Sequence, residues 1–215
     1  MKQIQAKSQE KLTLTDFLRG KTQFIIDPIV TFMARYRFSP DTLTILGMLF
    51  HFFYAWLIAN GQMAWAAVTM FILVPLDALD GSLARKLGRE QGGFGAFLDS
   101  TLDRLAEIVL FGGFIFYYVH LANEWMLAVT YLAITGSIMV SYTRARAEAL
   151  GLNAKIGVLS RVERYAVLMF FLVINQPHIG LIILAVFTYF TAFQRMYHVW
   201  KQTRPLKDST AANEG

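Results

Sequence analysis

Long apolar stretches separated by short polar turns cover most of the chain. Each approaches the roughly 20 residues that an α-helix needs to cross the hydrocarbon core of a bilayer. The pattern therefore predicts an all-α, polytopic membrane protein with six transmembrane helices. The expected spans lie at about residues 41–60, 63 into the 80s, 97–119, 125–146, 157–175 and 179–200.

The residues before the first span show a different pattern. From Thr15 to Arg37 the apolar positions follow helical spacing, with a break at Asp27-Pro28, where Asp27 can cap a helix and Pro28 can occupy its first turn. We interpret this segment as an amphipathic helix lying in the membrane interface. A short helix docked on the rest of the protein explains the pattern equally well.

Composition supports a membrane protein and narrows its chemistry. The 215 residues are 55% hydrophobic and 16% charged, with a mean hydropathy of +0.43, which is too apolar for an ordinary soluble domain. Cysteine is absent, so thiolate metal sites, iron–sulfur clusters and cysteine nucleophiles are excluded. Oxygen ligands remain.

The positions of the basic residues predict the orientation in the membrane. Of the 20 Lys and Arg residues, seven precede residue 40, four lie around the second connection, five around the fourth and four near the end. The turns near residues 61, 121 and 177 contain none. Under the positive-inside rule, both termini of this multi-pass plasma-membrane protein are expected in the cytoplasm. The net charge of +5 then reflects topology, and we expect no nucleic-acid partner.

Four aspartates interrupt the second and third apolar stretches. Asp77 and Asp80 are three residues apart, and Asp99 and Asp103 are four apart. Both spacings place paired carboxylates on one helix face. The apolar runs beside them, 63–76 and 108–119, are too short to cross the membrane alone, so the acids should lie in a cleft that opens to the cytoplasm.

Converging carboxylates repel one another unless cations neutralise them. Oxygen ligands favour Mg²⁺ or Mn²⁺ over zinc, and two such ions would match four acids. Arg85 is placed to hold a phosphate group. In the alternative interpretation some acids are solvated, or they pair with Arg85, Arg89 or Arg104.

The spacing Asp77-x2-Asp80-Gly81-x2-Ala84-Arg85-x9-Gly95-x3-Asp99-x3-Asp103 resembles the motif of the CDP-alcohol phosphotransferases, a family of integral membrane enzymes. The resemblance implies transfer of a phosphatidyl group from a CDP-linked lipid to an alcohol, with release of CMP. It further implies that Asp77, Asp80, Asp99 and Asp103 bind two divalent cations and that Asp103 is also the base. By the same resemblance, the residues that line the CDP site are Gly81, Ser82, Ala84, Arg85 and Gly95.

The acceptor is expected to carry a phosphate, because basic residues follow on the later helices. The stretches SYTRARAEALG and SRVERY resemble the inositol-phosphate-using branch, although that branch has Lys where Arg144 stands. The resemblance implies an acceptor-phosphate site at Arg144, Arg146, Arg161 or Arg164, and Arg195. Their other explanation is topological, since positive-inside charge would occupy the same connections.

Two other functions fit parts of the pattern. Glycerol 3-phosphate would suit the same basic cluster as an acceptor, which would make the chain a phosphatidylglycerol phosphate synthase. A divalent-cation transporter would use the aspartates as its transport site, but it predicts acids leading to the other face, where Glu124 is nearly alone. The expected organisation is residues 1–38 as N-terminal segment and interfacial helix, 39–202 as catalytic membrane domain and 203–215 as polar tail.

Several residues outside the motif also allow two interpretations. Glu107 either supports the metal ligands from behind or pairs with Arg104. The stretch Phe111-Gly112-Gly113-Phe114 is either a contact between helices or the face of a homodimer. The four histidines lack the spacing of metal ligands, and we expect them in the interface or the core.

Overall fold

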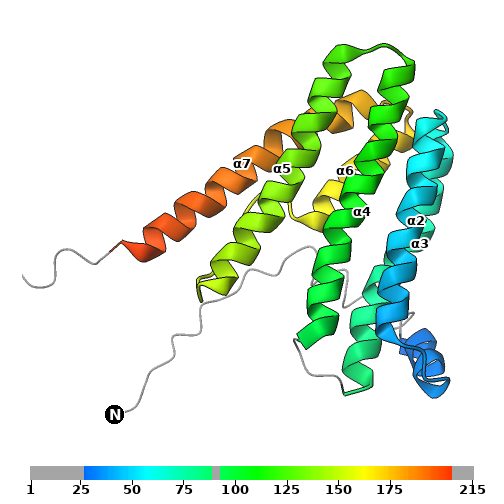
Figure 1. Cartoon of the computed structure of the whole chain (residues 1–215), viewed down its shortest axis with the longest axis vertical. Helices are drawn as coiled ribbons and strands as arrows, with labels where there is room; N and C mark the ends of the chain where they lie inside the picture. The colour runs from blue at the N-terminus through cyan, green and yellow to red at the C-terminus, as the bar shows by residue number, and fades with distance from the viewer. Residues whose placement is uncertain (1–26, 89–92, 205–215) are drawn as a thin grey trace, which may run out of the picture.

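The computed structural model describes residues 27–88 and 93–204, except for the side chains of residues 74–78 and 80. Within these ranges residues 27–35 form a short helical segment, and no strand occurs. The all-α prediction is therefore confirmed for the described part of the chain (Figure 1). The longer helices are α2 (Pro40–Ala59), α3 (Met63–Lys86), α4 (Gly93–His120), α5 (Glu124–Ala149), α6 (Arg161–Val173) and α7 (Pro177–Thr203).

The helix ends follow from local sequence. Pro40 and Pro177 stand in the first turns of α2 and α7, where a missing N–H costs nothing. The side chain of Asn123 accepts a hydrogen bond from the Met126 N–H at 3.1 Å and so caps α5. Gly61 ends α2 with a φ of 73°. These turns leave only short connections at one end of the bundle.

The six helices form a closed ring. Helix α2 packs against α3 and α4, α4 against α5, and α5 against α7; α7 packs against α6, and α6 returns to α3. Figure 1 shows α5 and α7 diverging from α2, α3 and α4 toward the end of the bundle away from the short turns. The helix segments that carry the candidate site residues lie in this more open half.

Apolar packing concentrates in the other half. The main core includes Tyr54 of α2, Met70 of α3, Phe114 of α4, Ala133 of α5 and Leu172 of α6, all nearly inaccessible to solvent. A second cluster joins Val30 of the short N-terminal segment to Leu79 and Leu83 of α3. This segment is therefore docked on α3, while its Phe32 and Tyr36 remain exposed.

Gly113 marks the closest approach between α2 and α4. A Cβ added at this position would lie 2.6 Å from the Ala55 carbonyl oxygen, which is far too close. At Gly112 an added Cβ would meet nothing within 4 Å. Gly113 is thus a contact between helices of the same chain, which favours the first interpretation of the Phe111–Phe114 stretch.

Within the described residues, three helices are long and apolar enough to cross a membrane by length and composition, namely α2, α5 and α7. This is expected of an integral membrane protein. Helices α3 and α4 have 24 and 28 residues, but their polar ends interrupt the apolar run. The expected fifth span, 157–175, was too long: α6 has 13 residues, or about 20 Å.

The shortening of α6 has a visible cause in the segment 150–160, which lies along α7 instead of continuing a helix. The Thr191 hydroxyl accepts from the Leu159 N–H at 3.2 Å, and Arg195 Nε donates to the Ile156 carbonyl at 2.8 Å. Gly157 adopts a φ of 128°, a conformation open mainly to glycine. Side chains of α7 thereby hold this connection in an extended path.

Candidate active site

Asp99 and Asp103 lie one turn apart on α4 and face the same small pocket. The pocket lies between α2, α4 and α6, so three helices distant in sequence contribute to it. Its lining combines apolar side chains with two acids, one histidine and one arginine. The lining residues are Thr44, Met48, His51, Asp99, Leu102, Asp103, Ala106 and Arg161.

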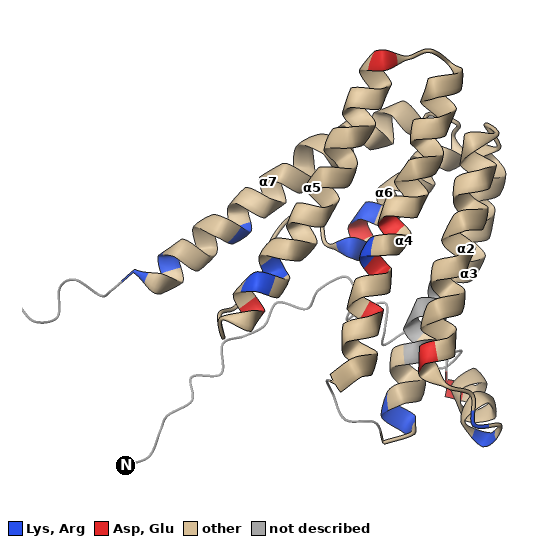
Figure 2. Cartoon of the chain, in the orientation of Figure 1, with Lys and Arg blue, Asp and Glu red and all other residues tan. Residues whose placement is uncertain are grey.

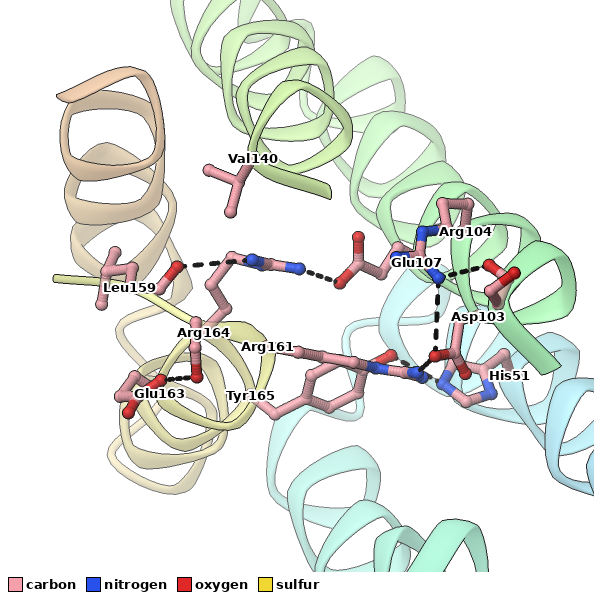
Figure 3. A network of polar contacts seen from close by, with 12 residues as sticks. His51, Asp103, Arg104, Glu107, Val140, Leu159, Arg161, Glu163, Arg164 and Tyr165 are labelled. Atoms are coloured by element: carbon pink, nitrogen blue, oxygen red, sulfur yellow. Dashed lines mark hydrogen bonds and ion pairs between the residues drawn. The ribbon is translucent and has the colours of Figure 1, made fainter. Parts of the chain in front are cut away.

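Arg161, the first residue of α6, forms an ion pair with Asp103 (Figure 3). Arg104 approaches the same carboxylate oxygen, with 3.7 Å between its Nη1 and Asp103 Oδ2. Both partners of the Asp103–Arg161 pair are partly accessible, at 22% and 29% of their side-chain surface. The predicted base and one of the predicted phosphate ligands therefore meet in a site that is partly exposed to solvent.

Glu107 and Arg164 form a second bridge between α4 and α6, one turn deeper in the bundle. Arg164 Nη2 donates to Glu107 Oε1 at 2.6 Å, and both side chains are about 95% buried. The partner of Glu107 is therefore Arg164 and not Arg104, which was the partner in one of the two interpretations of this residue. Because Arg164 is committed to this pair, Arg161 is the residue of the two that faces the pocket.

His51 is a pocket residue that sequence reasoning placed only in the interface or the core. It is buried, and its two ring nitrogens lie 2.9 Å from the Gly47 carbonyl and 2.9 Å from the Tyr165 hydroxyl. Tyr165 belongs to α6, 114 positions along the chain. No spacing rule connects residues so far apart, so the sequence contains no signal for this pairing.

The predicted nucleotide site lies on the last turns of α3 and the first turn of α4. Arg85 Nη2 donates to the Ser82 hydroxyl at 2.9 Å, and Gly81 lies beneath the Arg85 side chain. A Cβ added to Gly95 would stand 3.3 Å from an Asp41 carboxylate oxygen, so a larger residue would press on α2. Ala84, on α3, is partly buried.

Asp77 and Asp80 lie in α3, but their side chains are outside the described residues. In the part of the chain that the structure describes, no group of three or more His, Cys, Asp or Glu side chains is placed to hold a metal. Asp99 and Asp103 fit a divalent cation by their chemistry, since both offer carboxylate oxygens to one pocket. The four-aspartate site stays a prediction.

The other basic residues form a separate group on α5 and α7. Arg144 pairs with Glu148 at 2.9 Å on the exposed end of α5, and Arg146, two residues after Arg144, is exposed on the other side of the helix. Arg195 is buried, and its Nη1 donates to the Val140 carbonyl at 2.5 Å. Arg195 lies near enough to Arg144 and Arg164 to feel their charges. Figure 2 shows Lys and Arg gathered in the half of the bundle away from the first turn of α5, where Glu124 lies.

Comparison with known proteins identifies this arrangement. The family profile of CDP-alcohol phosphatidyltransferases matches residues 37–196, which is most of the chain and includes all four aspartates. The chain belongs to the CDP-alcohol phosphatidyltransferase family. Membership makes it an enzyme, and it removes the support for a divalent-cation transporter.

Relatives of this CDP-alcohol phosphatidyltransferase come from bacteria and archaea. The phosphatidylinositol phosphate synthase of Streptomyces avermitilis is 36% identical over 166 residues, which are 73% of this chain and 65% of that protein. The archaetidylinositol phosphate synthase of Pyrococcus horikoshii is 34% identical over 187 residues, or 86% and 96% of the two chains.

A solved structure has the same fold. The phosphatidylinositol phosphate synthase of Mycobacterium tuberculosis with CDP-DAG bound matches this CDP-alcohol phosphatidyltransferase with a TM-score of 0.77 and 30% identity, over 82% of this chain and 94% of that one. The same enzyme in complex with manganese and citrate gives a TM-score of 0.75 at 30% identity, over 81% of this chain and 88% of that one.

Proposed function

We propose that this enzyme transfers a phosphatidyl group from a CDP-linked lipid such as CDP-diacylglycerol to inositol phosphate, giving phosphatidylinositol phosphate and CMP. The observation that carries the proposal is the pairing of Arg161 with Asp103 in one accessible pocket. A phosphorylated polyol can exchange its phosphate for the carboxylate on Arg161 and bring a hydroxyl to the freed Asp103. An acceptor without a phosphate lacks the first of these interactions.

The reaction that we propose is a single in-line displacement. Asp103 accepts the proton of an acceptor hydroxyl, and that oxygen forms a bond to the phosphorus that carries the lipid. The bond from this phosphorus to the CMP oxygen breaks, and CMP leaves with its electron pair. Arg85 would hold the donor pyrophosphate, together with the surface formed by Gly81, Ser82, Ala84 and Gly95.

Two divalent cations, Mg²⁺ or Mn²⁺, would be held by Asp77, Asp80, Asp99 and Asp103. When bound, they supply the positive charge that the pyrophosphate and the leaving CMP require. The manganese in the related Mycobacterium tuberculosis structure supports this assignment.

For the acceptor phosphate we assign Arg161 as the ligand nearest the base. Arg144, Arg146 and Arg195 would attract the phosphate from the open side, because their charges lie in the same half of the bundle. Arg164 would affect the acceptor phosphate only indirectly, through its buried pair with Glu107.

We further infer that the chain crosses the membrane six times, with α6 starting inside the cytoplasmic cleft because its 13 residues are too few to cross the whole hydrocarbon core. Residues 39–202 are then the catalytic domain, and the pocket and both termini face the cytoplasm. The gathering of Lys and Arg in one half of the bundle supports this orientation. The lipid chains of the donor would then stay in the bilayer while its CDP group enters the pocket from the cytoplasm.

The test is a screen of acceptors with purified enzyme and Mg²⁺ or Mn²⁺. CMP release from CDP-diacylglycerol, and from its archaeal ether-lipid counterpart, is measured with inositol phosphate, glycerol 3-phosphate, serine and inositol in parallel. We expect inositol phosphate alone to give rapid release together with a phosphatidylinositol phosphate product. Release with glycerol 3-phosphate and not with inositol phosphate would contradict the proposal and make the enzyme a phosphatidylglycerol phosphate synthase.

An Arg161→Gln variant tests the assigned phosphate ligand within the same screen. Its KM for the phosphorylated acceptor should rise about tenfold or more, because a charge-assisted hydrogen bond to phosphate is lost. Lys201→Gln removes one exposed positive charge from the end of α7 and is the matched control.

A further inference from the structure

We propose that His51 and Tyr165 are positioning residues that fix Arg161 in the acceptor pocket. The inference rests on the proposed function, because it concerns the arginine assigned there to the acceptor phosphate. It gives α2, which carries none of the four aspartates, a part in acceptor recognition.

The hydrogen bonds of His51 define the state of its ring. A carbonyl oxygen can only accept, so the 2.9 Å contact with the Gly47 carbonyl places a proton on Nδ1. In a neutral ring Nε2 is then bare, and it accepts from the Tyr165 hydroxyl at 2.9 Å. The imidazole is 3% exposed, so no water competes for these two contacts.

The bond to His51 fixes the orientation of the Tyr165 ring. The two rings meet edge to face, with centroids 6.1 Å apart and planes at 84°. Tyr165 is itself buried, and it lies one helical turn beyond Arg161 on α6. The ring is therefore held at its hydroxyl end by α2 and at its backbone by α6.

Arg161 extends over this ring toward Asp103. Its guanidinium carbon lies 5.4 Å from the centroid of the Tyr165 ring, within the range of cation–π attraction. Figure 3 shows the chain of contacts from His51 through Tyr165 and Arg161 to Asp103. A long arginine side chain has many rotamers. Contact with a fixed aromatic ring already restricts them, so the side chain loses less conformational entropy when phosphate binds.

The experiment compares acceptor and donor affinities in variants of the full-length enzyme. Tyr165→Phe keeps the ring and removes the hydroxyl, whereas His51→Leu removes the acceptor of its hydrogen bond. Both should raise the KM for inositol phosphate about tenfold and leave the KM for CDP-diacylglycerol unchanged. His51→Gln should recover most of the loss, because its amide oxygen can accept from Tyr165.

Direct binding supplies a measurement that does not depend on turnover. Inositol phosphate is titrated calorimetrically into the Mg²⁺-loaded protein without the donor lipid, where both variants should bind it about tenfold more weakly than the wild type does. In an Arg161→Gln background, Tyr165→Phe should cause no further loss, because the residue that it positions is absent.

Two matched controls separate positioning from general packing. His120 makes the same bond to the carbonyl four residues earlier, but it is exposed at the far end of α4. The Tyr189 hydroxyl lies 2.9 Å from Thr135 and joins α5 to α7 away from the pocket. His120→Leu and Tyr189→Phe should leave both KM values unchanged.

Unchanged acceptor affinity in the His51 and Tyr165 variants, or an equal loss of donor and acceptor affinity, would overturn this inference. A variant that does not fold is recognised by its melting temperature. In that case the acceptor KM of His51→Gln, which keeps a hydrogen-bond acceptor for Tyr165, tests the inference. If the wild type uses another phosphorylated acceptor, the proposed function fails separately. The KM for that acceptor then replaces the KM for inositol phosphate in the same comparison.

Discussion

Asp103 is the residue on which the proposed chemistry depends most. Two guanidinium groups, from Arg161 and Arg104, approach its Oδ2. Before substrates bind, the proposed base Asp103 and the proposed phosphate ligand Arg161 are therefore paired with each other.

Asp103→Asn tests the role of this residue. The amide cannot accept the acceptor proton and is a poorer cation ligand, so CMP release with the preferred acceptor should fall by a factor on the order of 10³ or more. The melting temperature should change little, because the side chain is partly exposed. Glu124→Gln, which changes an acid in the first turn of α5 that does not line the pocket, is the control and should keep full activity.

Single residues also show where sequence reasoning succeeds. The spacing of Asp99 and Asp103 predicted a shared helix face, and both residues line one pocket. His51–Tyr165 and Glu107–Arg164 could not be predicted, because each pair joins positions that only the packing of separate helices brings together. A histidine or glutamate in an apolar helix indicates a buried partner without identifying it.

At the scale of helices, the contact between α2 and α4 depends on a residue without a side chain. Gly113→Ala should destabilise the protein by about 1–3 kcal/mol, because the new methyl group meets the Ala55 backbone and the helices must separate. Gly112→Ala is the adjacent control. It should be neutral or stabilising by up to about 1 kcal/mol, since alanine favours a helix and the site is open.

Thermal unfolding in detergent measures this pair of variants. Helix α2 also carries His51, so Gly113→Ala should reduce activity as well as stability. Equal melting temperatures for the two variants would mean that α2 and α4 do not pack as closely as described.

The buried bridge between α4 and α6 should behave as a unit. Glu107→Leu alone leaves the Arg164 charge buried without its partner, which should cost about 3–5 kcal/mol. The double variant Glu107→Leu with Arg164→Met should be less destabilised than either single variant, since no buried charge remains. A double-mutant cycle on melting curves measures the coupling, and strictly additive effects would contradict a direct pair.

Helix boundaries were predicted well wherever a turn signal stood in the sequence. Ser39-Pro40 and Asn60-Gly61 bracket α2 as expected. The start of α6 was misplaced because residues 157–160 look apolar and helical. Instead, the Leu159 N–H bonds to Thr191 of α7, and Arg195 of α7 bonds to the carbonyl of the preceding Ile156. Tertiary hydrogen bonds of this kind are not visible in a local pattern.

For the whole molecule, the sequence predicted the all-α class and the family, whereas the six membrane spans stay a prediction. It could not predict the closed order of the ring, in which α6 returns to α3. Hydropathy reports which residues avoid water and not which helices are neighbours, since a lipid-facing and a helix-facing leucine look alike. The orientation in the membrane follows from charge counting, and a direct measurement tests it.

The absence of cysteine makes that measurement simple, because a single introduced thiol is the only one in the chain. Leu121 and Lys155 are both exposed and lie in connections at opposite ends of the bundle. In intact cells a membrane-impermeant maleimide should label Leu121→Cys, whereas Lys155→Cys should react only after the membrane is permeabilised. The reverse pattern would place the pocket outside the cytoplasm. Labelling of both positions in intact cells would contradict an odd number of crossings between them.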